Sequence, residues 1–237
     1  PALINQIGRD GIGDENAPGY NYIWLSSLID IADTFSNYKK YDGANLWENP
    51  KMQAMLPSWL PLILCGRYQA QIGDSGSTGN LGTHLKLDDT LVGYINTKNP
   101  VLAQATYWLN NNSVTNLHTD IFTKDPEKIQ RDIQNVIDQY GEYNFSQSTM
   151  QPSWGLAVLR DGSYNPASNV SETYDTQRDF WMYFGRTSGH GHTGSMLNLG
   201  IHAYGLDMAP DLGYPEATGR DPNRMQWINT SLSHTAV

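Results

Sequence analysis

Two histidines separated by one glycine, His190 and His192, are the residues of this sequence best suited to chemistry. In an extended backbone, alternate side chains face the same side, so both imidazoles would point the same way. Such a pair can hold a metal ion, or one ring can bind metal while the other transfers protons. The glycines on either side, Gly189 and Gly191, would let a ligand or another backbone segment approach closely.

Two later residues, Asp211 and His234, extend this pattern toward a metal site. Together with a histidine they give a His/Asp/His set, which matches a zinc site with water as a fourth ligand. The alternatives are that Asp211 is a turn residue and that His234 lies on the surface of a strand.

Near the start of the chain, two carboxylates and two tyrosines lie in a loop that leads into a helix. Asp14, Glu15, Tyr20 and Tyr22 fall within nine positions of one another. A tyrosine can act as a base or an acid where nearby cations lower its pKa. The alternative is a helix-entry loop whose acidic residues are favoured near the helix N-terminus. A second polar loop, around Asp74, also has two interpretations: a turn with a capping aspartate, or part of a functional site.

The first half of the chain is predicted to be helical, so helices are expected to flank the loops that carry Tyr20 and Asp74. A segment from about Tyr22 to Tyr38 has apolar residues at helical spacing. Asn49-Pro50, Asn99-Pro100 and Asp125-Pro126 each place a capping residue before a first-turn proline, which is typical of helix starts. Cys65 is expected to be a buried, inert thiol inside an apolar helical stretch.

After Tyr143 the pattern changes to short strands. Segments 154–160, 179–185 and 196–204 read as strands, and the middle one is apolar enough to be buried on both faces. A boundary between a helical domain and a strand domain is therefore expected near residues 142–152.

Composition excludes some classes of protein. The net charge is -9, whereas a nucleic-acid-binding protein needs a basic face. No apolar run is long enough to span a bilayer. The hydrophobic content of 39% and the many aromatic residues are typical of a folded protein and suit carbohydrate enzymes, where flat rings stack on sugars.

The order of motifs resembles the heparinase II/III-like family of polysaccharide lyases over nearly the whole chain. The motifs that carry the resemblance are DGIGDENAPGYNY, QIGDSGS, GLAVLRDG, YFGRTSGHGH, APDLGYP and NTSLSHTAV. The resemblance implies an α+β multidomain fold: residues 1–145 as the C-terminal part of an (α/α) toroid, and residues 146–237 as the start of an antiparallel β-sandwich. It implies that the chain is an internal piece of a periplasmic or secreted protein.

The implied activity is β-elimination of an anionic polysaccharide that contains uronic acid, of glycosaminoglycan or alginate type. By motif, Tyr20 would be the base and acid, with Tyr22 as the alternative register, and His190 would be the catalytic histidine. Glu15 would orient the site. Arg160 and Arg186 would contact carboxylate or sulfate groups of the substrate. The metal ligands would be His192, Asp211 and His234, holding a structural divalent ion, expected to be zinc.

The sequence departs from the family pattern at several points. Gly194 stands where the family has an aspartate, and the asparagine of the family's SHNT motif is replaced, since the sequence here is Ser233-His234-Thr235-Ala236. The family's upstream catalytic Asn or His has no counterpart, so an incomplete active site is expected. Two other functions stay open: a toroid-fold glycoside hydrolase using paired carboxylates among Asp14, Glu15 and Asp74, and a polysaccharide-binding protein without catalysis.

Overall fold

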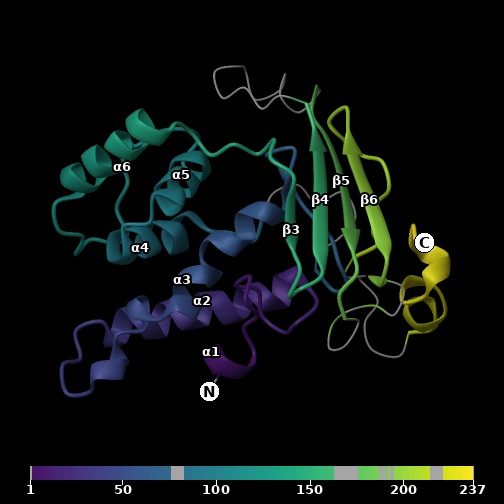
Figure 1. Cartoon of the computed structure of the whole chain (residues 1–237), viewed down its shortest axis with the longest axis horizontal. Coiled ribbons are helices and arrows are strands. Elements are labelled where there is room, and N and C mark those ends of the chain that lie inside the picture. Colours follow the sequence, from purple (N-terminus) through teal and green to yellow (C-terminus); the bar gives the residue numbers. More distant parts are fainter. Residues whose placement is uncertain are drawn as a thin grey trace. The chain divides into compact units, whose positions relative to one another are not determined.

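The computed structural model describes residues 2–75, 83–162, 176–186, 190, 192, 195–213 and 221–236. The chain divides into two compact units. The first consists of Pro1–Trp24, Pro61–His84 and Asn144–Val237, and is built around an antiparallel sheet. The second consists of Leu25–Leu60 and Leu85–Tyr143, and is helical. Figure 1 labels helices α1 to α6 and strands β3 to β6.

The expected Asn-Pro and Asp-Pro helix starts are confirmed. The side chain of Asn49 accepts from two backbone N–H groups at the start of α3 (Pro50–Met55). Asn99 caps α5 (Pro100–Leu109) and Asp125 caps α6 (Pro126–Tyr140), each accepting one backbone N–H. Each cap satisfies backbone donors that the helix leaves without a partner, which typically stabilises it by about 1 kcal/mol. The first long helix, α2, spans Pro18–Phe35, and a short helix α1 (Ala2–Asn5) precedes it.

Helix α4 (Leu87–Thr97) was not predicted from the sequence. Its N-cap position is Lys86, which makes no side-chain capping bond, so the local start signal is absent. Tertiary packing supplies the stability instead. Gly93 lets α4 pack closely, since a Cβ there would lie 3.0–3.1 Å from side-chain atoms of Leu102 and Leu56. Three 3₁₀ segments precede α4 in the chain: Asp42–Ala44, Leu46–Glu48 and Pro57–Leu62.

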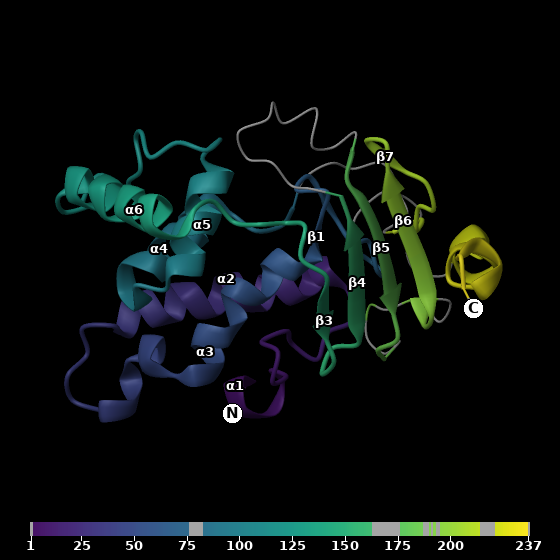
Figure 2. The ribbon, with the colours of Figure 1, turned by 45° about the horizontal axis from the view of Figure 1, so that its top comes forward.

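The sheet is a five-stranded antiparallel meander in the order β3-β4-β5-β6-β7, which Figure 2 shows from a second angle. Its strands are β3 (Thr149–Gln151), β4 (Leu156–Asp161), β5 (Arg178–Tyr183), β6 (Asn198–Ala203) and β7 (Leu206–Asp207). The three predicted strands correspond to β4, β5 and β6. Two very short strands, β1 (Ile63–Leu64) and β2 (Tyr68–Gln69), form a separate hairpin in the same unit.

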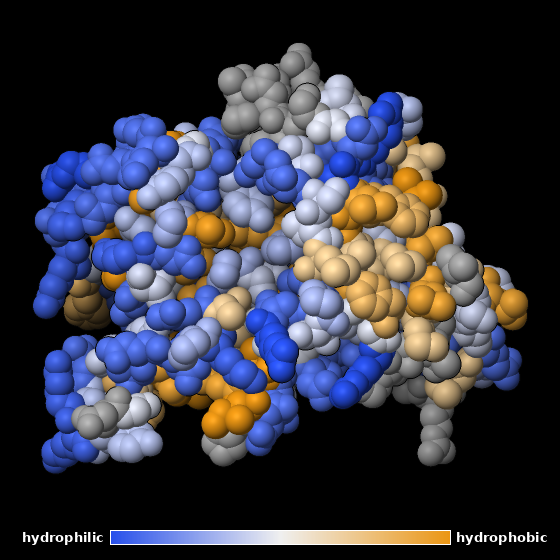
Figure 3. All heavy atoms as spheres, in the orientation of Figure 1, coloured by the Kyte–Doolittle hydropathy of each residue, from blue (hydrophilic) through white to orange (hydrophobic). Residues whose placement is uncertain are grey.

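The two faces of the sheet differ in burial. One face buries Leu156, Val158, Trp181 and Tyr183 almost completely. The opposite face carries Met150, Leu159, Phe180, Met182, Ile201 and Leu206. Most of these are exposed, and Figure 3 shows a broad hydrophobic area over the strands. The expectation that segment 179–185 is buried on both faces is therefore wrong: β5 alternates between buried residues and half-buried ones, as a sheet with one open face does.

The prediction for Cys65 is correct for its burial and wrong for its secondary structure. The thiol is buried, as expected. Its backbone, however, lies in the turn between β1 and β2 with φ at +49°, not in a helix. The apolar run around it is divided between a 3₁₀ segment and the β1–β2 hairpin, because Pro57 and Pro61 interrupt regular α-helical hydrogen bonding.

At the level of fold class, the structure is mixed helix and antiparallel sheet, as predicted. The division at residues 145/146 into part of a toroid and part of a β-sandwich stays a prediction. Among the described residues, no helix is long and apolar enough to cross a membrane.

Candidate functional site

Tyr20 and His190 lie against each other as a stacked pair. Their ring centroids are 3.5 Å apart and their planes differ by 4°. Tyr20 sits in the first turn of α2, whereas His190 precedes β6, so the fold joins residues from opposite ends of the chain. The His190 side chain is 43% exposed, which leaves the pair accessible from solvent.

Glu15 fixes the orientation of His190. One carboxylate oxygen lies 3.0 Å from the ring Nδ1, and the other accepts the backbone N–H of His190 at 3.0 Å. Burial by itself raises the pKa of Glu15, but these bonds from His190 outweigh it and hold the pKa below its usual value. Because an ionised carboxylate can only accept, Nδ1 carries the proton, and the lone pair of a neutral His190 is on Nε2. The Glu15 carbonyl in turn accepts from Trp154 Nε1 at 3.1 Å and from Asn21 Nδ2.

A cavity of about 530 Å³ borders the Glu15 loop. Asp14, Asn16, Trp154 and Arg186 are among its lining residues. Arg186 and Asp14 form an exposed ion pair at 3.0 Å. Arg186 is therefore accessible beside this cavity, and its contact with a substrate stays a prediction.

Arg160, on β4, is not among the residues that line this cavity. Its side chain is 2% exposed and its Nε is 3.4 Å from a carboxylate oxygen of Asp179, which is fully buried. The guanidinium donates to four oxygens: the carbonyls of Pro61, Ile63 and Gln147, and the hydroxyl of Thr149. This placement supports a structural role, and substrate contact by Arg160 finds no support.

Tyr22 is not part of the stacked pair. It is 4% exposed, and its ring lies 6.3 Å from that of His84. His84 Nδ1 is 2.8 Å from Gln69 Nε2, and burial lowers the pKa of His84. Of the two tyrosines that the sequence offers, Tyr20 is therefore the one placed against His190.

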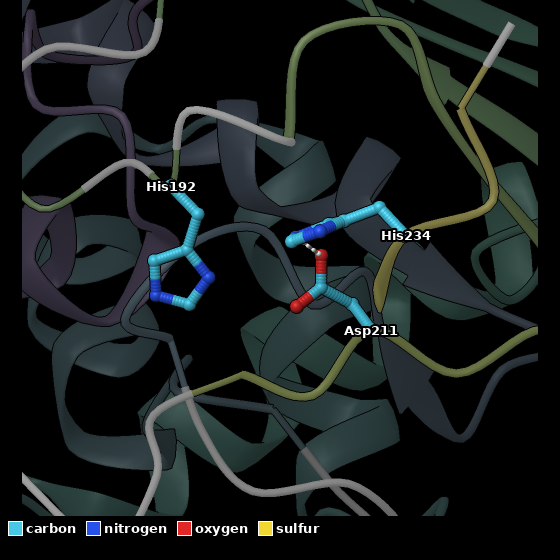
Figure 4. A group of neighbouring side chains, drawn as sticks. All are labelled: His192, Asp211 and His234. Atoms are coloured by element: carbon cyan, nitrogen blue, oxygen red, sulfur yellow. Dashed lines mark ion pairs between the residues drawn. The ribbon is translucent and has the colours of Figure 1, made fainter. Parts of the chain in front are cut away.

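The three expected metal ligands, His192, Asp211 and His234, converge. Their ligand atoms all lie within 4.8 Å of one another, and all three residues are nearly buried. Figure 4 shows them reaching toward a common point from three separate segments. His234 Nε2 is 3.3 Å from an Asp211 oxygen, and the two imidazoles meet edge to face with centroids 5.8 Å apart.

The surrounding hydrogen bonds leave one ring nitrogen of each histidine available. His192 Nε2 is 2.8 Å from Asp74 Oδ1, and His234 Nδ1 is 2.7 Å from the Thr230 carbonyl. The other nitrogens are buried: His192 Nδ1 has no hydrogen-bond partner among the residues that the structure describes, and His234 Nε2 faces the Asp211 oxygen at 3.3 Å. Two buried lone pairs beside a carboxylate are the donor set of a divalent cation, so the residues fit a metal.

The electrostatics of His234 point the same way. Burial alone would lower its pKa, but the Asp211 carboxylate and the Thr230 carbonyl hold the pKa above its usual value. The negative charge of Asp211 thus favours a positive charge at His234. Asp211 is itself held by Asn198 Nδ2 and by the backbone N–H of Gly213, both at 2.8 Å.

Sequence reasoning did not assign Arg224, Asn198 or His84 to this region, and it left the role of Asp74 open. No local pattern marks Arg224, whose guanidinium is 2.8 Å from Asp74 Oδ2. Gly189, Gly191 and Gly194 fall outside the described residues.

No protein-family model matches the chain. No curated protein matches it either. The chemistry open to the site therefore has to follow from its own residues.

Proposed function

We propose that this chain contributes catalytic residues to a polysaccharide lyase that cleaves a uronic-acid polymer by β-elimination. The observation that carries the proposal is the stacking of Tyr20 on His190, with Glu15 orienting the imidazole. Two proton-transferring groups in contact, one of them oriented by a carboxylate, is the arrangement that general acid–base catalysis needs.

In this reaction a base removes the proton from C5 of the uronate. The electron pair of that C–H bond forms the C4–C5 double bond, and the bond from C4 to the leaving oxygen breaks. The leaving oxygen then takes up a proton. We assign the proton transfers to Tyr20 and the support of the developing charge to His190, with Arg186 at the adjacent cavity contacting an anionic group of the polymer.

His192, Asp211 and His234 would hold a divalent metal, zinc being the ion that prefers this ligand set. When bound, the ion would cross-link three segments of the chain. We propose a structural role for this ion, because it would join three segments that are distant in the sequence. A periplasmic or extracellular location is proposed with the function.

A glycoside hydrolase would need a pair of available carboxylates. Each carboxylate considered for that role is engaged: Asp14 with Arg186, Glu15 with His190, and Asp74 with both His192 and Arg224. These contacts favour the lyase over the hydrolase.

The test is ultraviolet absorbance of the full protein with a panel of uronate polymers, since elimination leaves a conjugated, absorbing product. Tyr20→Phe is expected to lower turnover by about 10²–10⁴-fold, the usual contribution of a positioned acid or base. Tyr22→Phe is the matched control and should retain most activity, since Tyr22 is buried two residues away. Equal losses in both variants, or new reducing ends without absorbance, would refute the assignment. Binding without any product would favour the non-catalytic alternative.

A further inference from the structure

We infer that Asp74 is a positioning residue that holds both histidines of the His190–His192 pair at once. Its backbone N–H donates to the His190 carbonyl at 2.9 Å, and its carboxylate accepts from His192 Nε2 at 2.8 Å. The inference rests on the proposed function for the catalytic role of His190 and for the metal. Asp74 lies 118 residues before His192 in the chain.

The contact is buried on both sides. The His192 side chain is 1% exposed and that of Asp74 is 3% exposed, so water cannot replace the bond. A carboxylate accepts from Nε2, which places the proton there and leaves the lone pair on Nδ1. Nδ1 is the atom that faces Asp211 and His234 (Figure 4), and none of the described residues gives it a hydrogen-bond partner. Asp74 thereby selects the tautomer of His192 that can bind a metal.

Arg224 completes the arrangement from the other side. Its guanidinium donates to Asp74 Oδ2 at 2.8 Å, and its side chain is 16% exposed. With one oxygen held by Arg224 and the other by His192, the carboxylate cannot rotate. The positive charge of Arg224 also offsets the cost of burying the Asp74 charge.

The geometry ties metal binding to the stacked pair. The same turn, ending in Asp74 and Ser75, fixes the His190 backbone and the His192 ring. A movement of His192 in the metal cluster would therefore move Asp74, which also holds the backbone of His190. Because the link to His190 is a backbone bond, a side-chain substitution at Asp74 alters only the link to His192.

The experiment is a metal titration of the full protein with Co²⁺ and Zn²⁺ in competition with a chelator, without any polysaccharide. Asp74→Asn removes the charge but keeps an acceptor, and it is expected to weaken metal affinity about 10–100-fold, with a changed Co²⁺ visible spectrum. Asp161→Asn is the matched control: this carboxylate is 81% exposed and far from the cluster in the sheet register, so affinity should not change. Arg224→Lys keeps a positive charge and should retain most of the affinity, whereas Arg224→Ala should lose part of it.

A purely structural role for Asp74 predicts a different result. The metal-free Asp74→Asn protein would melt at a lower temperature, but its affinity and Co²⁺ spectrum would match those of the Asp161→Asn control, and this would overturn the inference. If Asp74→Asn does not fold, the Arg224→Lys and Arg224→Ala pair decides: equal affinities in the two would also overturn it. Failure of the unsubstituted protein to bind either ion would remove the proposed metal and this inference together, leaving the absorbance assay to judge the lyase separately.

Discussion

Replacing Asp179 by alanine should destabilise the sheet unit by about 3–5 kcal/mol, because it leaves the buried Arg160 charge without a counter-ion. The Asp179 side chain is fully buried and Arg160 is 2% exposed. Burial raises the pKa of Asp179 in spite of the bonds it accepts and the nearby guanidinium. The carboxylate also accepts the Cys65 backbone N–H at 2.6 Å and a Gln177 side-chain N–H at 2.8 Å. A buried N–H that loses its acceptor adds to the cost.

The chain offers an internal control on the same two strands. Asp161 and Arg178 are the next pair in the β4–β5 register and form an ion pair at 3.5 Å, but their side chains are 81% and 51% exposed. Asp161→Ala should leave the free energy of unfolding nearly unchanged, because exposed ion pairs are screened by water.

Urea unfolding followed by tryptophan fluorescence and far-ultraviolet circular dichroism would measure both variants. The double variant Arg160→Met, Asp179→Leu should recover much of the loss, since it removes both buried charges together. The reasoning is refuted if Asp179→Ala costs no more than Asp161→Ala, or if the double variant is less stable than Asp179→Ala. Either result would mean that the buried pair is not the element that holds the β1–β2 turn to the sheet.

Two further predictions concern the same unit. Burial lowers the pKa of His202 to about 4 and raises the pKa of Asp207 to about 6. Between these two pKa values, His202 binds more protons in the unfolded state than in the folded state, so its contribution makes the stability rise with pH. Asp207 binds more protons in the folded state than in the unfolded state, so its contribution makes the stability fall as the pH rises. Thermal melts from about pH 4 to 6 should therefore show rising stability in Asp207→Asn and falling stability in His202→Asn, and slopes of the same sign would contradict this. Separately, a Cβ at Gly200 would lie 2.0 Å from the Trp181 indole, so Gly200→Ala should cost about 1–3 kcal/mol in urea unfolding. An unchanged midpoint would show that the strands adjust freely.

The sequence predicted best those elements whose signals are local. The helices opened by Asn49, Asn99 and Asp125 start where expected, because a capping side chain and a proline act within one turn. Helix α4 lacks such a cap and depends on packing around Gly93, which no local pattern reveals. The two-sided burial expected for β5 was wrong because apolar composition does not say which neighbours cover a face.

Some residues of the candidate site could likewise be predicted from the sequence, and others could not. His192, Asp211 and His234 could be grouped from residue type and family resemblance, and the structure brings them together. The bond from Asp74 to Arg224 spans 150 residues, and no spacing rule predicts such a contact. Charge alone made Arg160 a candidate for substrate contact, but charge does not distinguish a buried arginine from an accessible one.

Because Cys65 is buried, the rate at which its thiol is modified can report how often the fold opens locally. This is the single cysteine of the sequence, its side chain is in the interior, and burial raises the pKa of its thiol to about 12. A thiol-modifying reagent needs an accessible thiolate, so it can react only after the β1–β2 turn detaches from Asp179. The modification rate under native conditions therefore measures how often this turn opens, without a label having to be introduced.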